Sequence, residues 1–121
     1  MSFKIFAIFY FIKRILKNFS NTMCEFKIIK KNDGSQILED IVVLSYTDDN
    51  QLLFRDVMGA GDTLPSALIL DVNTLNQTCT VFEHDLVKPF MELMMRFESG
   101  KITSSDIELF QEMVEKIKKE I

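Results

Sequence analysis

The sequence predicts an α+β fold, in which a small five-stranded antiparallel sheet, curled or closed into a barrel, precedes a C-terminal helical hairpin. Short β-branched and apolar runs recur about every ten residues from Glu25 to Glu83, with turn residues between them. After His84 the apolar spacing changes to the period of three to four residues that is typical of amphipathic helices. A chain of 121 residues, 47% hydrophobic and 26% charged, suits one small globular domain with an appendage.

The first 22 residues differ in composition from the rest of the chain. Their charged residues are all basic: Lys4, Lys13, Arg14 and Lys17. Residues 23–121 therefore hold ten basic and eighteen acidic groups, a charge of −8. The apolar run from Ile5 to Ile12 is too short for a membrane-spanning helix, which needs about 20 residues. Three interpretations stay open: residues 1–22 precede a true start at Met23, anchor the chain to a membrane surface, or form a helix packed on the domain.

The predicted sheet domain covers residues 23–84. Its five strands are expected at residues 25–31, 36–47, 51–57, 66–72 and 78–83. Asp33-Gly34 predicts a hairpin turn between the first two strands, and Glu39-Asp40 predicts a bulge or bend within the second. Asp48–Asn50 and Asn73–Asn76 are further turns. The glycine-rich stretch from Met58 to Pro65 is predicted to be a loop.

The predicted helical hairpin lies within residues 85–121. One apolar stripe runs through Leu86, Phe90, Leu93 and Phe97, and a second through Ile107, Phe110, Val114, Ile117 and Ile121. Ser99-Gly100 is expected to end the first helix, and Thr103 with Asp106 to cap the second. The stripes, together with Met91, Met94 and Met95, are predicted to pack on the sheet. The alternative is a dimer interface.

The residues with reactive side chains do not predict an enzyme. The chain has no CxxC, HExxH, phosphate-binding glycine loop or Ser/His/Asp motif, and His84 is its only histidine. Cys24 and Cys79 lie in unlike segments, which indicates a reduced, cytoplasmic protein without a disulfide. Cys79 is predicted to be a core residue. His84 is predicted to be a hydrogen-bonded or solvated residue at the junction of sheet and helices, with a metal ligand as the alternative.

Three carboxylates are predicted to be turn residues. They are Asp48, Asp49 and Asp62.

Residues 23–84 resemble the CooT-like nickel-binding proteins, a family of small domains also described as predicted RNA-binding proteins. The resemblance rests on an opening MCEFKII, the Asp33-Gly34 turn, LEDIVVLSY leading to LLFRDVMG, and a closing ALILDVNTLNQTCTVFE. It implies a homodimeric β-domain that binds one Ni(II) ion at the dimer interface through the cysteine after the initiator methionine. That residue is Cys24 here. The implied role is nickel delivery to a metalloenzyme such as carbon monoxide dehydrogenase.

This sequence departs from the family pattern in three places. Residues 1–22 precede Met23, the helical hairpin follows the family domain, and Asn76-Gln77 stands where the last turn often reads Asn-His. If Met23 is the initiator and is removed, Cys24 carries both a thiol and an α-amine, with ordinary pKa values of about 8.5 and 7.7–8.0. Sulfur and nitrogen donors in a plane suit Ni(II), and a two-fold axis through the site doubles the donor set.

Two other functions remain as alternatives. A small β-domain can bind RNA, with a basic patch of Lys27, Lys30, Lys31 and Arg55. Phe26 and Phe54 are predicted to fill the core, with base stacking as the alternative. The charge of −8 over residues 23–121 disfavours this function, because nucleic-acid affinity comes mainly from basic surfaces. The other alternative is a structural interaction module that uses the C-terminal helices.

Overall fold

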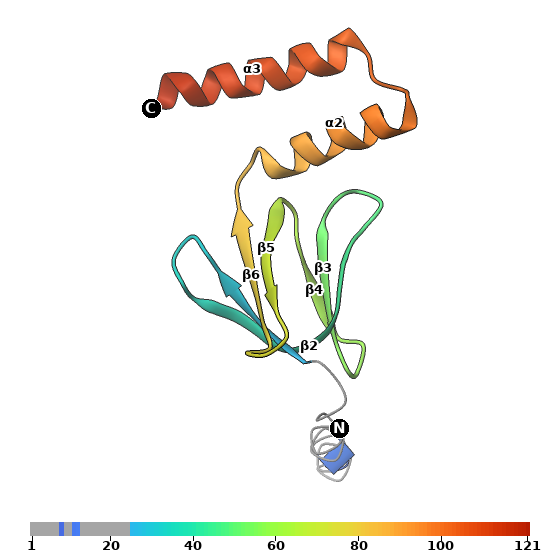
Figure 1. Ribbon diagram of the computed structural model, residues 1–121, viewed down its shortest axis with the longest axis vertical. Coiled ribbons are helices and arrows are strands. Elements are labelled where there is room, and N and C mark those ends of the chain that lie inside the picture. The colour runs from blue at the N-terminus through green and yellow to red at the C-terminus, as the bar shows by residue number, and fades with distance from the viewer. Residues whose placement is uncertain (1–7, 9–10, 13–24) are drawn as a thin grey trace.

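The computed structural model describes Ile8, Phe11, Ile12 and residues 25–121. Six strands are followed by two helices, so the predicted α+β class is confirmed (Figure 1). The strands are β1 (Phe26–Lys30), β2 (Gln36–Tyr46), β3 (Leu52–Asp56), β4 (Gly61–Leu64), β5 (Ala67–Asn73) and β6 (Thr78–Glu83). The helices are α2 (Val87–Ser99) and α3 (Ser104–Glu120). Neither of these helices is long and apolar enough to cross a membrane.

The sheet is mixed and open, which corrects the prediction of five antiparallel strands or a closed barrel. Its order is β4-β3-β2-β1-β6-β5, so β4 and β5 are the edges of the described sheet. Strands β1 and β6 pair in parallel, while the other neighbours are antiparallel. The sheet curves enough for the Tyr46 hydroxyl on β2 to donate to the Ala67 carbonyl of β5 at 2.9 Å.

Strand β4 lies where the sequence predicts only a loop. The turn before it is held by Asp56, whose Oδ1 accepts from the Met58 and Ala60 amides at 2.9 and 3.0 Å. Gly61 then pairs with Arg55 of β3. A Cβ at Gly61 would lie 1.9 Å from the Phe54 carbonyl oxygen, so glycine allows the two strands to approach closely. The predicted loop is therefore wrong for Gly61–Leu64.

The predicted turn and bulge near β2 are confirmed. Gly34 adopts a φ of 75°, which favours glycine, directly after Asp33. Farther along β2, Leu38 pairs with Ile28 of β1 and Ile41 pairs with Phe26. The segment of β2 between these two pairs is therefore one residue longer than the facing segment of β1. The extra residue in β2 is accommodated at Asp40, whose φ is 57°.

Among the residues that the structure describes, the buried hydrophobic core lies entirely within the sheet. Its buried residues are Ile28, Ile41, Leu52, Phe54, Ala67, Cys79 and Val81, each with at most 3% of its surface exposed. Neither helix contributes a buried residue. The folded sheet domain therefore has its own core, and the hairpin lies beyond one end of it (Figure 1).

The hairpin has the predicted boundaries. Helix α2 ends at Gly100, whose φ is 73° and whose amide donates to the Arg96 and Phe97 carbonyls. Helix α3 begins after Thr103, which forms a reciprocal capping box with Asp106. The prediction that the apolar stripes pack on the sheet is wrong, because much of both stripes stays exposed. Those side chains have too few neighbours within the described chain to be covered.

Candidate functional site

Cys24, the predicted metal ligand, lies outside the described residues, and so does Met23. The structure does define the place where their segment joins the sheet. Glu25 directly precedes β1, and the parallel register pairs Lys27 with Thr78 and Lys30 with Val81. Because β6 continues toward His84 and the helices, Glu25 lies at the opposite end of the sheet from the hairpin (Figure 1).

Cys79 is confirmed as a core residue. It is fully buried in β6 and forms no disulfide. Burial raises the pKa of its thiol, because a thiolate would lose hydration in the apolar interior. Cys79 is therefore poorly suited to bind a metal or to react with one from solution.

His84 is confirmed as a hydrogen-bonded junction residue. Its Nδ1 accepts from the Leu86 amide at 3.0 Å, so in the neutral ring the proton is on Nε2. Its ring stacks on Phe82 with centroids 6.2 Å apart. Ser66 completes the junction: its hydroxyl donates to the His84 carbonyl at 2.5 Å and accepts from the Lys88 amide at 3.0 Å.

The part of the chain that the structure describes contains no group of three His, Cys, Asp or Glu side chains arranged to hold a metal ion. Asp48 and Asp49 lie in the predicted turn before β3. Asp62 does not lie in a turn: it belongs to β4, where its Oδ1 accepts from the Thr63 amide at 2.8 Å.

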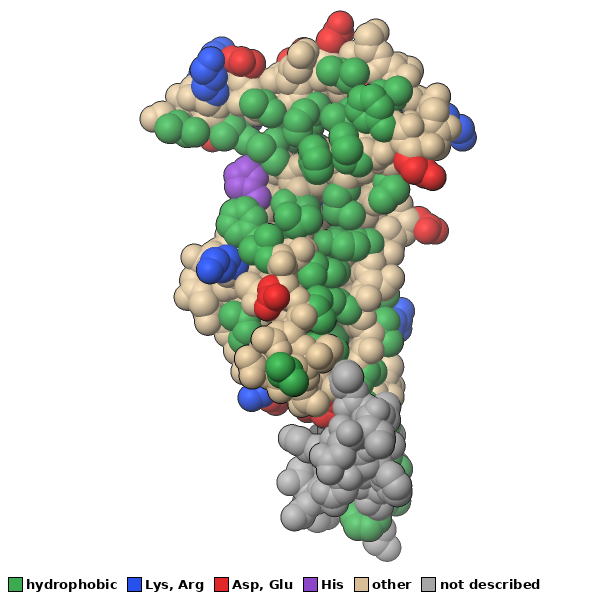
Figure 2. All heavy atoms as spheres, viewed as in Figure 1, with side chains coloured by type: hydrophobic (Ala, Val, Ile, Leu, Met, Phe, Trp, Pro, Cys, Tyr) green, Lys and Arg blue, Asp and Glu red, His purple; other side chains and the backbone are tan. Residues whose placement is uncertain are grey.

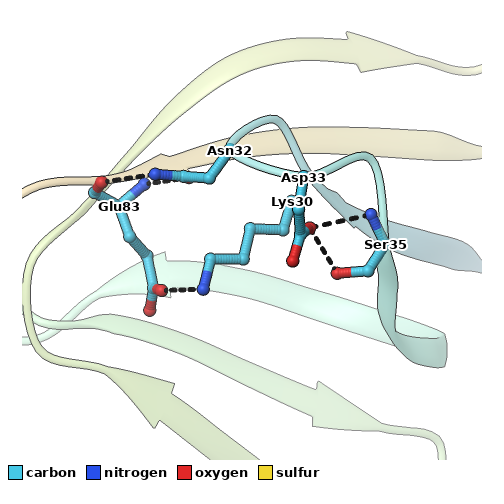
Figure 3. Close-up of polar contacts among 5 residues, drawn as sticks. All are labelled: Lys30, Asn32, Asp33, Ser35 and Glu83. Carbon is cyan, nitrogen blue, oxygen red and sulfur yellow. Dashed lines mark hydrogen bonds and ion pairs between the residues drawn. The ribbon is translucent and has the colours of Figure 1, made fainter.

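A polar cluster at the helix-facing end of β1 and β6 was not predicted from the sequence. Figure 3 shows Lys30 and Glu83 pointing toward each other, with Nζ and Oε2 2.7 Å apart. The Asn32 side chain accepts from the Glu83 amide at 3.0 Å and donates to the Glu83 carbonyl at 2.9 Å. The Asn32 side chain thus bonds to the Glu83 backbone in the way that the backbone of a neighbouring strand would.

The same cluster includes the turn between β1 and β2. The Ser35 amide and hydroxyl donate to Asp33 Oδ1 at 2.9 and 2.6 Å, and these bonds lower the pKa of the carboxyl (Figure 3). Hydrogen bonding and charge from Glu83 raise the pKa of Lys30. A neighbouring hollow of about 240 Å³ is lined mainly by apolar side chains. Because Lys30 and Glu83 neutralise each other at its edge, we assign this cluster a structural role.

The structure adds an exposed apolar surface on the helical hairpin. It consists of Phe90, Met94 and Phe97 on α2 and of Ile107, Val114 and Ile121 at and beyond α3, all of them 38% or more exposed. Their spacings place each set along one side of its helix. We call these six residues the hairpin surface. The apolar spacing in the sequence predicted the two stripes. It did not predict that their side chains are exposed, because exposure depends on how the helices pack against the rest of the chain.

Hydrophobic side chains in Figure 2 gather over both helices and continue over the sheet below them. Strand β5 contributes Leu68, Leu70 and Val72, which are 42–50% exposed. A separate groove of about 500 Å³ runs between α2 and α3. Charged side chains border that groove, among them Arg96 and Asp106, which form an ion pair.

The residues proposed for RNA stacking and phosphate contact are not all available. Phe54 is fully buried, and Lys30 is paired with Glu83. Phe26 is half-buried against the core.

Comparison with known proteins found no family model and no curated protein that matches the chain.

Proposed function

We propose that this protein is a nickel-binding accessory protein, in which Cys24 supplies thiolate to one Ni(II) ion shared between two copies. Its role is to deliver the ion to a nickel enzyme such as carbon monoxide dehydrogenase. The resemblance of residues 23–84 to the CooT-like proteins supports this proposal, as does the ordered sheet that follows the Met-Cys-Glu segment.

The burial of Cys79 is the observation that carries the proposal furthest. The chain has two cysteines, and Cys79 is fully enclosed in the core. Thiolate binding of a soft or borderline metal therefore depends on Cys24. Its segment joins the sheet at Glu25, at the end opposite the helices, and Cys79 pairs with Ile28 farther along β1.

The proposed ligand chemistry follows from the position of Cys24 in the chain. If Met23 is the initiator and is removed, the thiolate sulfur and α-amine of Cys24, together with backbone amide nitrogen, match the planar N and S donors that Ni(II) accepts. One chain offers few such donors, and a two-fold axis through the ion would double them. Binding requires loss of protons from these groups, so the affinity for nickel is expected to rise with pH.

Titration with Ni(II) tests the proposal. The chain beginning at Met23 is expected to develop sulfur-to-nickel absorption, and Cys24→Ser is expected to abolish it. Cys79→Ala is the matched control, because it removes the buried thiol and should leave the absorption unchanged. Unaltered nickel affinity in Cys24→Ser would refute the proposal.

A second comparison tests the role of the terminal amine. The full chain from Met1 keeps the Cys24 thiol but places its nitrogen within a peptide bond. Weaker nickel binding by the full chain than by the chain expressed from Met23, once mass analysis has shown that Met23 is removed and Cys24 is N-terminal, would support amine coordination. Equal affinity would exclude the amine from the site while leaving the thiolate.

RNA binding has less support, since Phe54 lies in the core and residues 23–121 carry a charge of −8.

A further inference from the structure

We propose that two copies of this chain associate through the hairpin surface and form a four-helix bundle, with α3 of one copy antiparallel to α3 of the other. This inference does not rest on nickel binding. The hairpin lies at the opposite end of the sheet from Glu25, and the hairpin surface contains no His, Cys, Asp or Glu side chain.

The size of the apolar area points to a macromolecular partner. An aromatic side chain can bury about 150–250 Å² and an aliphatic one somewhat less, so the six residues of the hairpin surface offer on the order of 600 Å². The exposed residues of β5 extend this apolar area to on the order of 800 Å². Monomeric proteins rarely expose patches larger than about 300–600 Å². A standard interface takes about 800 Å² from each partner. The hairpin surface alone therefore approaches the area of a standard interface, and it reaches that area where β5 is covered as well.

The arrangement of residues on α3 favours a second copy as that partner. Ile107 and Ile121 lie seven positions before and after Val114. Antiparallel pairing about a two-fold axis at Val114 thus places each isoleucine opposite the other and Val114 opposite itself. The same surface serves both copies, as an isologous interface requires.

The charges along α3 favour the antiparallel orientation. Residues 104–112 carry three acidic groups and no basic group, whereas residues 113–121 carry three lysines and two acidic groups. The halves therefore have charges of −3 and +1. Antiparallel pairing brings unlike halves together and also opposes the two helix dipoles. Parallel pairing would set the two acidic halves against each other.

Measurement of mass in solution tests the interface. The full chain carrying Cys24→Ser, in the presence of a chelator, is expected to sediment as a dimer of the 14.1-kDa chain. Phe97→Glu in this background should raise the dimer Kd at least about 30-fold, because a half-exposed aromatic ring of the hairpin surface is replaced by a charge. Leu75→Glu is the matched control: Leu75 is 95% exposed in the turn after β5, and the substitution should leave the Kd unchanged.

Cysteine cross-linking tests the orientation and does not depend on the folding of Phe97→Glu. In the Cys24→Ser background, Val114→Cys should form an intermolecular disulfide on mild oxidation. Ile107→Cys alone should not, whereas a mixture of Ile107→Cys and Ile121→Cys chains should. Strong cross-linking of Ile107→Cys to itself would overturn the antiparallel arrangement.

Three results would overturn the dimer itself. One is a monomeric mass for the Cys24→Ser chain at concentrations of tens of micromolar. Another is a dimer that Phe97→Glu and Leu75→Glu weaken equally. The third is a dimer that persists in folded Phe97→Glu but is lost on removal of residues 1–22, which would assign association to that segment. Loss of nickel binding with the dimer intact would instead count only against the metal proposal.

Discussion

The sheet domain and the helical hairpin are both built from amphipathic sequence, yet they are stabilised differently. Seven apolar residues of the sheet are at most 3% exposed, whereas neither helix has a buried residue. The hairpin depends on its caps, on the Phe90–Phe110 contact and on the Arg96–Asp106 ion pair. Isolated short helices are marginal in water, so the comparison teaches that the hairpin needs a cover that the sheet does not provide.

Matched phenylalanine substitutions should show the largest difference between the two regions. Phe54→Ala removes a fully buried ring from the sheet and should lower the free energy of unfolding by about 3–5 kcal/mol. Phe97→Ala removes a ring that is 50% exposed and should cost less than about 1 kcal/mol in dilute, monomeric protein. Urea unfolding followed by circular dichroism measures both values. Equal losses would mean that the hairpin shares the core of the sheet.

A glycine substitution tests how closely the sheet edge is packed. Gly61→Ala places a Cβ against the Phe54 carbonyl oxygen and should cost about 1–3 kcal/mol, with faster amide exchange in β3 and β4. Thr63→Ala, at an exposed position of the same strand, is the control and should change stability by about 0.5 kcal/mol or less. The hairpin amides should keep their exchange rates in both variants. An unchanged stability in Gly61→Ala would show that β4 lies farther from β3 than the structure indicates.

Most strand positions follow from the sequence because alternation and turn residues are local signals. Gly61 was misinterpreted because glycine is common in turns, whereas here it relieves a close approach to β3. The parallel pairing of β1 with β6 could not be predicted, since alternation shows which side chains face the core but not which strand is adjacent.

The site residues were predictable to different degrees. The roles of Cys79 and His84 followed from their local context, and both are confirmed. The Asn32–Glu83 bonds join residues 51 positions apart, a relation that no local pattern reports. Cys24 stays a prediction. The exposure of the hairpin surface was missed because a helical stripe looks the same whether a sheet or a partner covers it.

The cap of α3 gives a smaller effect that is confined to the hairpin. Thr103→Ala removes the hydroxyl that accepts from the Asp106 amide at 3.2 Å and should cost about 0.5–2 kcal/mol of helix stability. Thr103→Ser retains an acceptor and should recover most of the loss. Amide exchange should accelerate in the first turn of α3 while β1 and β6 stay protected. Faster exchange in the sheet as well would show that the two regions unfold together.

Mild acid should give the smallest of these effects, and it should loosen the hairpin before it loosens the sheet. Hydrogen bonds from the Thr103 backbone and hydroxyl lower the pKa of Asp106, with a further contribution from Arg96. Because the pKa of Asp106 is lower in the folded chain, its carboxylate stabilises the folded start of α3 at every pH above the unfolded-state pKa of about 3.9. This stabilisation is lost as the pH falls through the folded-state pKa. Amide exchange near Thr103 should therefore accelerate below about pH 4, and Asp106→Asn should flatten that dependence. Asp33 titrates in the same direction, but it anchors only a turn, while the core of the sheet holds no titrating carboxyl. We therefore expect the start of α3 to loosen before β1 and β6 lose protection, and simultaneous loss would contradict the independence of the hairpin.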